Sequence, residues 1–391
     1  MTTRDVAVIG AGSFGAWTAL GLRRRGASVL LVDQYGPGNA RASSGGESRV
    51  LRMGYGPDEL YTRMSMRSLA QWQALDPAAP EPLFRQTGVL WLARRADRYT
   101  ADTLATLARA GVPHEALDAD AIRARYPQFA LDEDVRGILE PQSGALMARR
   151  AVQAVVREAV RAGVEYRTAG VAPPGAAPDG AAPDGPGRRM PAVRASDGTA
   201  IAAGAFVFAC GPWLPKVFPD LLGPRIFPTR QEVFFFGPPP GDDRFAPPAM
   251  PAWIDFGAEV YGLPDLEARG FKIAPDRHGA AIDPDAAERL VGAESVARVR
   301  AFLARRFPAL AAAPLLETRV CQYENTSNGD FLIDRHPDRE NVWIAGGGSG
   351  HGFKHGPAVG EYVAALLAGA GAPEPRFALA VKGVVQQRAV Y

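Results

Sequence analysis

Three glycines near the N-terminus have the spacing of a turn that binds a dinucleotide. Residues 10–15 read Gly-Ala-Gly-Ser-Phe-Gly and follow a β-branched run. Gly10 would permit the tight turn, Gly12 would let the backbone approach a pyrophosphate, and Gly15 would allow close packing of helix on strand. Asp33 ends the next apolar run, at about the spacing from which a carboxylate binds the ribose hydroxyls. The combination predicts a dinucleotide site, with FAD and NAD both open; the alternative is a plain glycine turn.

Lysine is rare in this chain, so each lysine is a candidate for chemistry. Of 44 basic residues only four are lysines: Lys216, Lys272, Lys354 and Lys382. Lys272 lies between apolar Phe271 and Ile273, where a point charge favours a functional role over a solvated surface position.

The two cysteines could form at most one disulfide. Cys210 and Cys321 stand outside any CxxC pair or metal-ligand pattern. We therefore expect no metal site and a reducing compartment, the cytoplasm. Cys210 is interpreted as ordinary packing.

The elements that position these residues alternate between strands and helices. A strand pattern at residues 5–9 leads through the glycine turn into a helix at 16–25, and a second strand follows at 28–32. The alternation continues with a helix at 151–162, strands at 164–166, 205–211 and 341–345, and a helix at 357–367. This order predicts an α/β fold around a buried, mostly parallel sheet.

A second glycine-rich junction joins the last predicted strand to the last helix. Residues 346–354 read Gly-Gly-Gly-Ser-Gly-His-Gly-Phe-Lys. A helix N-terminus there could face an anionic part of a cofactor or substrate. The alternative is a tight loop without a functional role.

The middle of the chain has a different pattern. From residue 230 to about 256, aromatic-rich strands alternate with proline-rich connections, and residues 286–307 read as helical. We expect an inserted antiparallel sheet with helices on one face, hence a second domain. Residues 172–187 contain Ala-Ala-Pro-Asp-Gly twice and predict a mobile surface loop between two strands.

Composition limits the classes of partner. With 391 residues, 47% of them hydrophobic, the chain is long enough for two domains and too apolar for a disordered protein. The net charge of +2 leaves no broad basic surface for nucleic acid or an anionic membrane. Apolar stretches end well before the roughly 18 residues of a membrane span. We expect small molecules as partners.

Three more segments join the glycine turn in a recognisable order. They are Ser-Ser-Gly-Gly-Glu-Ser-Arg-Val-Leu-Arg at 43–52, Cys-Gln-Tyr-Glu-Asn-Thr at 321–326 and Gly-His-Gly-Phe-Lys at 350–354. With them the chain, from about residue 5 to about residue 380, resembles the monomeric sarcosine oxidase family. That family includes N-methyltryptophan oxidase, pipecolate oxidase and the fructosyl amino acid oxidases. The resemblance implies FAD in place of NAD, and a monomer.

The resemblance also implies how two domains divide the chain. A Rossmann-like FAD-binding domain would comprise residues 1–85, 140–220 and 320–391. An inserted antiparallel-sheet (α+β) catalytic domain would comprise residues 86–139 and 221–319, and its sheet would roof the isoalloxazine ring of the flavin.

The cofactor contacts implied by the resemblance include a covalent one. The sulfur of Cys321 would be joined to the 8α-methyl carbon of the flavin, since a thiolate can add at that electrophilic position; the alternative is a buried, inert cysteine. Lys272 would lie beside flavin N5, where a fixed ammonium stabilises negative charge developing on O₂. The other implied contacts are Gly10, Gly12, Gly15, Asp33, Ser43, Ser48, Arg49, Gly348, Gly350 and Lys354.

The resemblance further implies a pocket for an amino acid. Arg52, as a planar fork, and Lys354, as a flexible ammonium, would grip the substrate carboxylate; the alternative for each is a salt bridge within the protein. Tyr261, Tyr323 and His351 would line the pocket, His351 as a general base or as a hydrogen-bond partner. The expected catalytic residues are Lys272, Arg49 and His351.

Two segments depart from the family pattern. Bacterial sarcosine oxidases have paired histidines where this chain has Ser44 and Gly45, and a histidine where it has Pro275 and Asp276, with His278 slightly later. Gly45 removes bulk near the ring, and Asp276 adds negative charge if it points inward. These changes argue against sarcosine itself as the substrate.

The implied activity is oxidation of a secondary amino acid, N-methylated or cyclic, at its C–N bond. The product is an imine, and O₂ is reduced to hydrogen peroxide. Two alternatives stay open: an FAD-dependent amine dehydrogenase or demethylase of the same fold that uses another electron acceptor, and a non-catalytic FAD-binding protein. Lys272 favours the oxidase.

Overall fold

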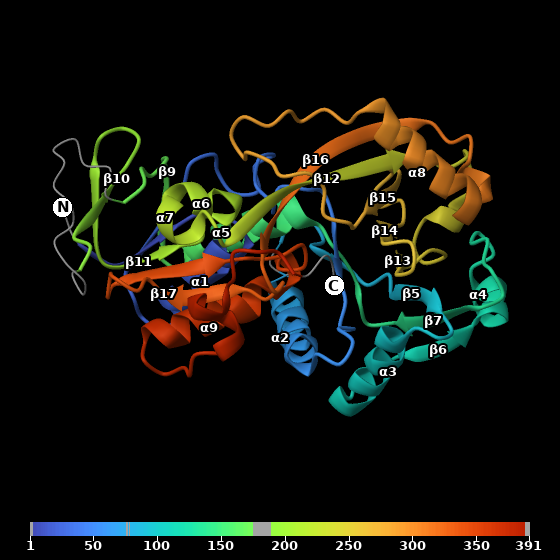
Figure 1. The fold of residues 1–391 in the computed structure, drawn as a ribbon, viewed down its shortest axis with the longest axis horizontal. Helices are drawn as coiled ribbons and strands as arrows, with labels where there is room; N and C mark the ends of the chain where they lie inside the picture. The colour runs from blue at the N-terminus through green and yellow to red at the C-terminus, as the bar shows by residue number, and fades with distance from the viewer. Residues whose placement is uncertain (1–2, 76, 78, 175–188, 388–391) are drawn as a thin grey trace.

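Two large sheets organise the chain (Figure 1). The computed structural model describes residues 3–75, 77, 79–174 and 189–387, so residues 175–187 of the loop predicted at 172–187 lie outside the described residues. Among the residues it describes, no helix combines the length and the apolar character that crossing a membrane requires.

The first sheet is the expected parallel sheet. Within the described residues its order is β17 (Leu332–Arg335), β18 (Val342–Gly346), β11 (Ala200–Phe208), β1 (Arg4–Ile9), β2 (Val29–Asp33) and β9 (Glu165–Thr168), with β10 (Ala192–Arg194) paired to β11. Pairing is parallel from β18 to β9, whereas β17 and β10 pair antiparallel. Segments that are distant in sequence therefore build one sheet around the first strand.

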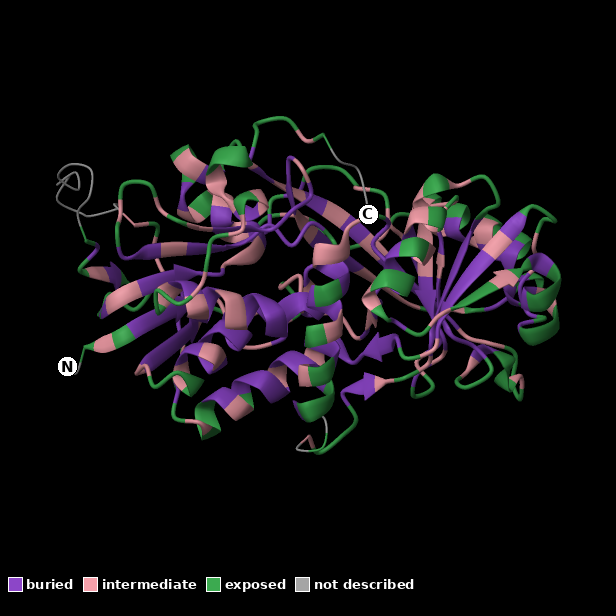
Figure 2. Ribbon diagram, turned by 90° about the horizontal axis from the view of Figure 1, so that it is seen from below, coloured by how far each residue is buried: buried purple, intermediate pink, exposed green. Residues whose placement is uncertain are grey.

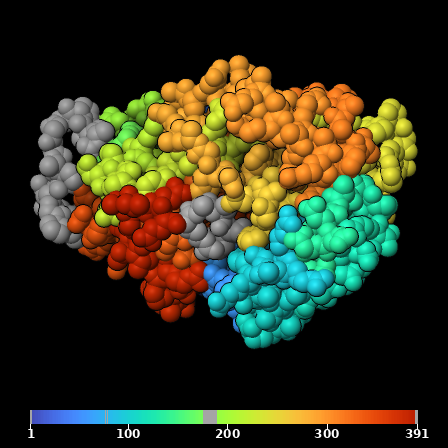
Figure 3. Space-filling view, turned by 45° about the vertical axis from the view of Figure 1, so that its right-hand side comes forward, coloured from blue at the N-terminus to red at the C-terminus, as the bar shows by residue number. Residues whose placement is uncertain are grey.

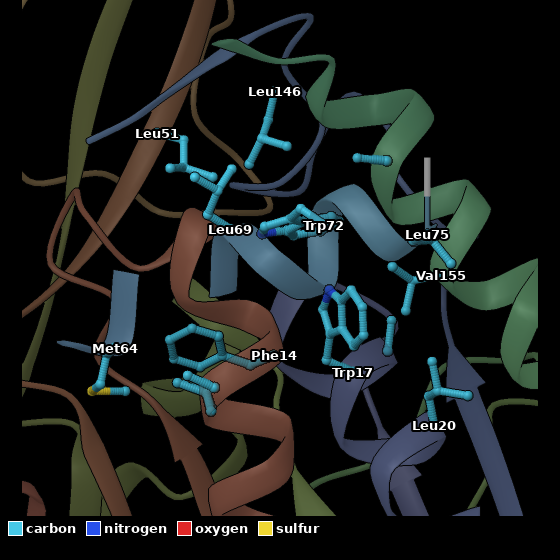
Figure 4. Packing of buried hydrophobic residues seen from close by; sticks show 14 of the residues in the cluster. Phe14, Trp17, Leu20, Leu51, Met64, Leu69, Trp72, Leu75, Leu146 and Val155 are labelled. Atoms are coloured by element: carbon cyan, nitrogen blue, oxygen red, sulfur yellow. The ribbon is translucent and has the colours of Figure 1, made fainter. Parts of the chain in front are cut away.

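The central strand β1 is buried on both faces, as a parallel sheet between two layers requires. Val6 and Val8 belong to one apolar cluster, and Ala7 and Ile9 to another. The first cluster, part of which Figure 4 shows, is built with α1 (Ser13–Arg24), α2 (Glu59–Leu75), α5 (Ala148–Arg161) and α9 (Gly356–Leu367). The second cluster includes residues of α6 (Leu214–Val217) and α7 (Pro219–Leu222).

The second sheet forms the other half of the molecule. Within the described residues its order is β16 (Leu315–Thr326), β12 (Ile226–Phe236), β15 (Phe271–Pro275), β14 (Val260–Leu263), β13 (Ala252–Asp255), β5 (Val89–Arg94), β7 (Val135–Glu140) and β6 (Glu115–Asp118). The expected antiparallel pairing is wrong at one point, because β13 and β5 pair in parallel. A long connection through the first sheet joins these two strands, so no hairpin dictates their direction.

The two faces of this sheet differ in composition. Alternate residues of β12 and β15, among them Phe234, Phe271 and Ile273, pack in a core with α4 (Ala119–Arg125) and α8 (Ala293–Arg306). Lys272 and Ala274 take the intervening positions of β15 and face the other way. Figure 1 shows β12 and β16 as long strands that reach from this half toward the first sheet. The face of the second sheet that carries Lys272 and Ala274 therefore meets the parallel sheet at β12 and β16.

The helix predicted at 286–307 is wrong over its first turns. α8 begins only at Ala293, after Gly292 in the N-cap position, and residues 286–292 form turns and irregular chain. Leu290 is 72% exposed, whereas Val291 packs against the core of the second sheet without forming part of a helix.

Shorter elements complete the fold. They are a small sheet of β3 (Arg49–Leu51), β8 (Gly144–Leu146) and β4 (Phe84–Arg85), helix α3 (Arg98–Ala110) and a 3₁₀ turn, η5 (Phe353–His355). Figure 2 shows buried strands inside both halves and exposed outer faces on the helices. In Figure 3 the segment around residue 100 (cyan) and the C-terminal segment (red) lie on opposite halves. The domain boundaries stay a prediction, although the α/β fold class is confirmed.

Candidate active site

A cavity of about 550 Å³ lies at the carboxyl ends of β1, β2 and β11, where ligands bind in folds with an open parallel sheet. The predicted contacts that line it are Gly10, Gly12, Asp33, Ser43, Arg49, Gly348 and Gly350, together with Tyr323. The other predicted cofactor contacts, Gly15, Ser48, Lys272, Cys321 and Lys354, do not line the cavity.

The glycine turn is too tight for side chains at two positions. Gly10 has φ of 106°, and a Cβ there would lie 2.3 Å from the carbonyl oxygen of Ala209. A Cβ on Gly15 would lie 1.8 Å from the carbonyl oxygen of Gly10. Helix α1 therefore starts directly against β1, with Gly12 at its N-cap and no acidic residue in its first turn, and the N–H of Ser13 donates to Ser44 Oγ at 3.1 Å. This end of the helix is suited to a phosphate.

Asp33 is held rigidly at the end of β2. Its Oδ2 accepts the N–H of Ala11 at 2.8 Å, and its Oδ1 accepts those of Tyr35 and Gly36, each at 2.9 Å. Burial raises the pKa of Asp33, and these three bonds oppose that shift. A carboxylate fixed in this way is suited to binding ribose hydroxyls.

Lys272 is buried on the face of the second sheet that points away from the core with α4 and α8, with 1% of its surface exposed. Its Nζ donates to the carbonyl oxygen of Ser48 at 2.6 Å and lies 5.9 Å from the centroid of the Tyr261 ring. Burial lowers the pKa of Lys272 well below its ordinary value, and the nearby Arg49 lowers it further.

Arg49 connects the segment that carries Ser48 to Cys321. Its guanidinium donates to the carbonyl oxygens of Ser48 and Ser43, each at 2.9 Å, and to Cys321 Sγ at 3.3 Å. Cys321 is a free, half-buried thiol opposite Gln231 on β12. The structure thus brings Lys272, Ser48 and Cys321 together around Arg49 at one end of the cavity, although of these four only Arg49 lines it.

A smaller pocket of about 70 Å³ adjoins this end, and the predicted substrate contacts Arg52, Tyr261, Tyr323, His351 and Lys354 all line it. Arg52 and Lys354 are 7% and 4% exposed, and neither forms an ion pair with an acidic side chain in the described part of the chain. Two buried cations without a carboxylate partner are suited to binding an anion.

The aromatic ring of Tyr55 supports both cations. The guanidinium carbon of Arg52 lies 4.3 Å from the ring centroid, and Lys354 Nζ lies 4.9 Å from it. Lys354 Nζ also donates to the carbonyl oxygen of His351 at 3.1 Å. Burial, and then the charge of Arg52, lower the pKa of Lys354 well below its ordinary value.

Asp276 lines the same pocket, so its side chain does point inward. Its Oδ1 accepts the hydroxyl of Tyr323 at 2.9 Å. Burial raises the pKa of Asp276, whereas the Tyr323 bond, Arg52 and Lys354 lower it. Burial also raises the pKa of Tyr261 to about 12 and that of Tyr323 well above 10, so both hydroxyls remain protonated.

Both ring nitrogens of His351 are engaged. Nδ1 lies 3.2 Å from the hydroxyl of Tyr55, and Nε2 lies 3.1 Å from the carbonyl oxygen of Gly329. The Tyr55 hydroxyl also lies 2.7 Å from Nε2 of His355. This arrangement favours His351 as a hydrogen-bond partner over a general base.

Three site residues were not expected from the sequence. Glu324 lines the large cavity, and burial raises its pKa to about 7. Tyr55 and His355 lie behind the cation pair. The sequence offered one signal for Tyr55 and His355. Tyr55 follows Arg52 by three residues, and His355 comes directly after Lys354.

The parallel sheet, the glycine turn and the cavity define a dinucleotide-binding protein. The family model described as FAD dependent oxidoreductase matches residues 5–366. The chain is 32% identical to monomeric sarcosine oxidase of Streptomyces avermitilis, over 93% of each protein. It is 29% identical to N-methyl-L-tryptophan oxidase of Yersinia pestis, over 93% of this chain and 94% of the relative. The chain belongs to the monomeric sarcosine oxidase family, as its motifs predicted.

A solved structure shows the same fold. L-proline dehydrogenase from P. horikoshii superposes with a TM-score of 0.80 over 96% of this chain and 97% of that one, at 21% identity. Because that identity is low, the likeness concerns the fold alone.

The cavity suits FAD along its length. The glycine turn and the N-terminus of α1 would hold the pyrophosphate, and Asp33 the adenosine ribose. Glu324 offers a polar contact between them and the flavin end: its Oε2 is shielded from solvent and has no hydrogen-bond partner among the described residues. Arg49, Lys272 and Cys321 would surround the ring.

Proposed function

We propose that this chain is an oxidase of secondary amino acids, N-methylated or cyclic. It oxidises the C–N bond to an imine, which hydrolyses, and reduces O₂ to hydrogen peroxide. The observation that carries the proposal is the pair of buried cations, Arg52 and Lys354, without an acidic partner in the described chain, in a pocket next to the flavin end of the cavity.

The cation pair orients the substrate. Bound FAD supplies the acceptor for a hydride equivalent from the carbon next to nitrogen and the route from there to O₂. Arg52 and Lys354 bind the substrate carboxylate, so the amine end points toward Lys272 and Arg49. The substrate nitrogen must be deprotonated, since an ammonium cannot supply electrons, and the surrounding positive charge lowers its pKa.

Lys272 serves the oxygen reaction. Its ammonium is fixed by the carbonyl of Ser48 before any charge develops, so no reorganisation is needed when O₂ becomes negative. Because the fold also serves a dehydrogenase, the fold does not decide the electron acceptor; Lys272 favours O₂.

Cys321 is the proposed covalent link to the 8α-methyl carbon of FAD. Its Sγ lies 3.3 Å from the guanidinium of Arg49, the residue that also lines the proposed flavin end of the cavity. Cys210 stays assigned to packing: burial strongly raises the pKa of its thiol. The cytoplasmic location and the monomeric state stay predictions.

An anaerobic screen tests the proposal independently of the electron acceptor. The purified holoenzyme is mixed without oxygen with N-methyl amino acids, proline, pipecolate and glycated amino acids, and the flavin absorbance is followed. We expect at least one of these acids to bleach the flavin, and its decarboxylated amine to react far more slowly. A set in which no acid bleaches the flavin, or an amine that reacts as fast as its parent acid, would overturn the proposal.

A further inference from the structure

His355 lies behind the cation pair, and neither the family motif nor the proposed reaction assigns it a task. It is fully buried in η5, directly after Lys354. Its Nε2 lies 2.7 Å from the hydroxyl of Tyr55, the residue whose ring supports both Arg52 and Lys354. The side chain of Tyr55 therefore lies between His355 and each of the two cations.

The hydrogen-bond chain fixes the direction of each bond. The carbonyl oxygen of Gly329 can only accept, so Nε2 of His351 carries the hydrogen and Nδ1 of His351 accepts from Tyr55. The Tyr55 oxygen, having given its hydrogen to His351, accepts from Nε2 of His355. His355 Nδ1 is then a bare lone pair, and it has no partner within the described residues.

A neutral donor is what this position requires. The aromatic rings of Tyr55, Tyr61, Phe331 and His351 surround His355. Burial lowers the pKa of His355 well below its ordinary value, and Lys354, His351 and Arg52 lower it further. A protonated His355 would be a third positive charge; the neutral ring donates a hydrogen bond without adding one.

We propose that His355 is a positioning residue for the carboxylate site. By holding the Tyr55 hydroxyl it fixes the ring that sets the separation of Arg52 and Lys354. The inference rests on the proposed function, in which the two cations bind the substrate carboxylate.

Acetate and acetamide are the probes, because they share a shape and differ in charge. Each is titrated into the holoenzyme, and binding is read from the flavin spectrum. We expect His355→Leu to weaken acetate roughly 3- to 10-fold, the scale of one neutral hydrogen bond, and to leave acetamide unchanged. His355→Gln, whose amide can donate from a similar place, should restore acetate binding to within about twofold.

Tyr55→Phe supplies a second route to the same answer if His355→Leu does not fold. It should weaken acetate as much as His355→Leu, and the double variant should be no weaker than either, because both remove one bond. Equal losses for acetate and acetamide, or a Gln variant as weak as the Leu variant, would overturn the inference.

Lys354→Ala separates this inference from the function on which it rests. If Lys354→Ala weakens acetate and His355→Leu does not, the positioning role is wrong and the carboxylate site stands. If neither variant weakens acetate, the proposed carboxylate site itself is wrong.

Discussion

Replacing Lys272 by Met removes one charge and little else. Met has a similar length, and Lys272 is 1% exposed between Phe271 and Ile273, which pack on the opposite face of β15. The variant should therefore fold, leaving the Ser48 carbonyl without this donor. Any large kinetic effect then reports the missing ammonium.

The size of the effect follows from Coulomb's law. A unit charge about 4 Å from the developing negative charge on O₂, at an effective dielectric constant of about 20, contributes about 4 kcal/mol. Its loss should slow reoxidation of the reduced enzyme by O₂ about a thousandfold. Stopped-flow absorbance measures this step separately from anaerobic reduction by substrate, which should change only a few-fold. Lys272→Arg, which keeps the charge, is the matched control and should retain most of the oxygen reactivity.

The same charge predicts a pH dependence with a definite sign. Burial lowers the pKa of Lys272, so the ammonium is lost as pH rises through a value well below 10.5. Reoxidation of the wild-type enzyme should slow as pH rises through that range, and reoxidation of Lys272→Met should not respond to it. Equal slowing of both half-reactions in Lys272→Met would refute the oxygen role, as would a wild-type rate that does not fall with pH.

Three further predictions test separate parts of the site. Acid denaturation should leave yellow colour on the wild-type chain and on Cys210→Ala and release it from Cys321→Ala; free flavin from the wild type would end the covalent assignment. Lys354→Ala should weaken carboxylate inhibitors by about 1.5–3 kcal/mol, the scale of a charged hydrogen bond, and unchanged inhibition constants would remove Lys354 from the pocket. Burial raises the pKa of Glu324 from 4.5 to about 7. The folded apoprotein therefore holds the proton on the Glu324 carboxyl more tightly than the unfolded chain does. As a result, the free energy of unfolding falls as pH rises between these two values. Glu324→Gln should remove at most about 3 kcal/mol of that fall in urea titrations of the apoprotein, and parallel pH profiles for both proteins would contradict the shift.

The local signals in the sequence identify the parts of the site that lie on single elements. Gly10 and Gly15 indicate a turn too tight for side chains, and the structure has that turn. Lys272 stands out because a lone charge alternates with apolar residues on one strand. In each case, neighbours in the sequence determine the geometry.

Contacts between distant segments could not be read in this way. The hydrogen bond between His355 and Tyr55 joins residues separated by 300 positions, and neither residue belongs to a pattern that indicates the other. The parallel pairing of β13 with β5 depends on how the second sheet closes. The sequence predicts a helix from residue 286, but α8 begins only at Ala293. Apolar residues before Gly292 favour a helix face, whereas tertiary packing leaves Leu290 exposed.

The fate of the electrons tests the central claim most directly. With a substrate from the anaerobic screen, an oxygen electrode and a peroxide assay measure O₂ consumed and peroxide formed per amine oxidised. The arrangement of Lys272 and the paired cations predicts one of each per amine. Substrate oxidation that proceeds with a quinone acceptor and consumes no O₂ would contradict it and identify a dehydrogenase.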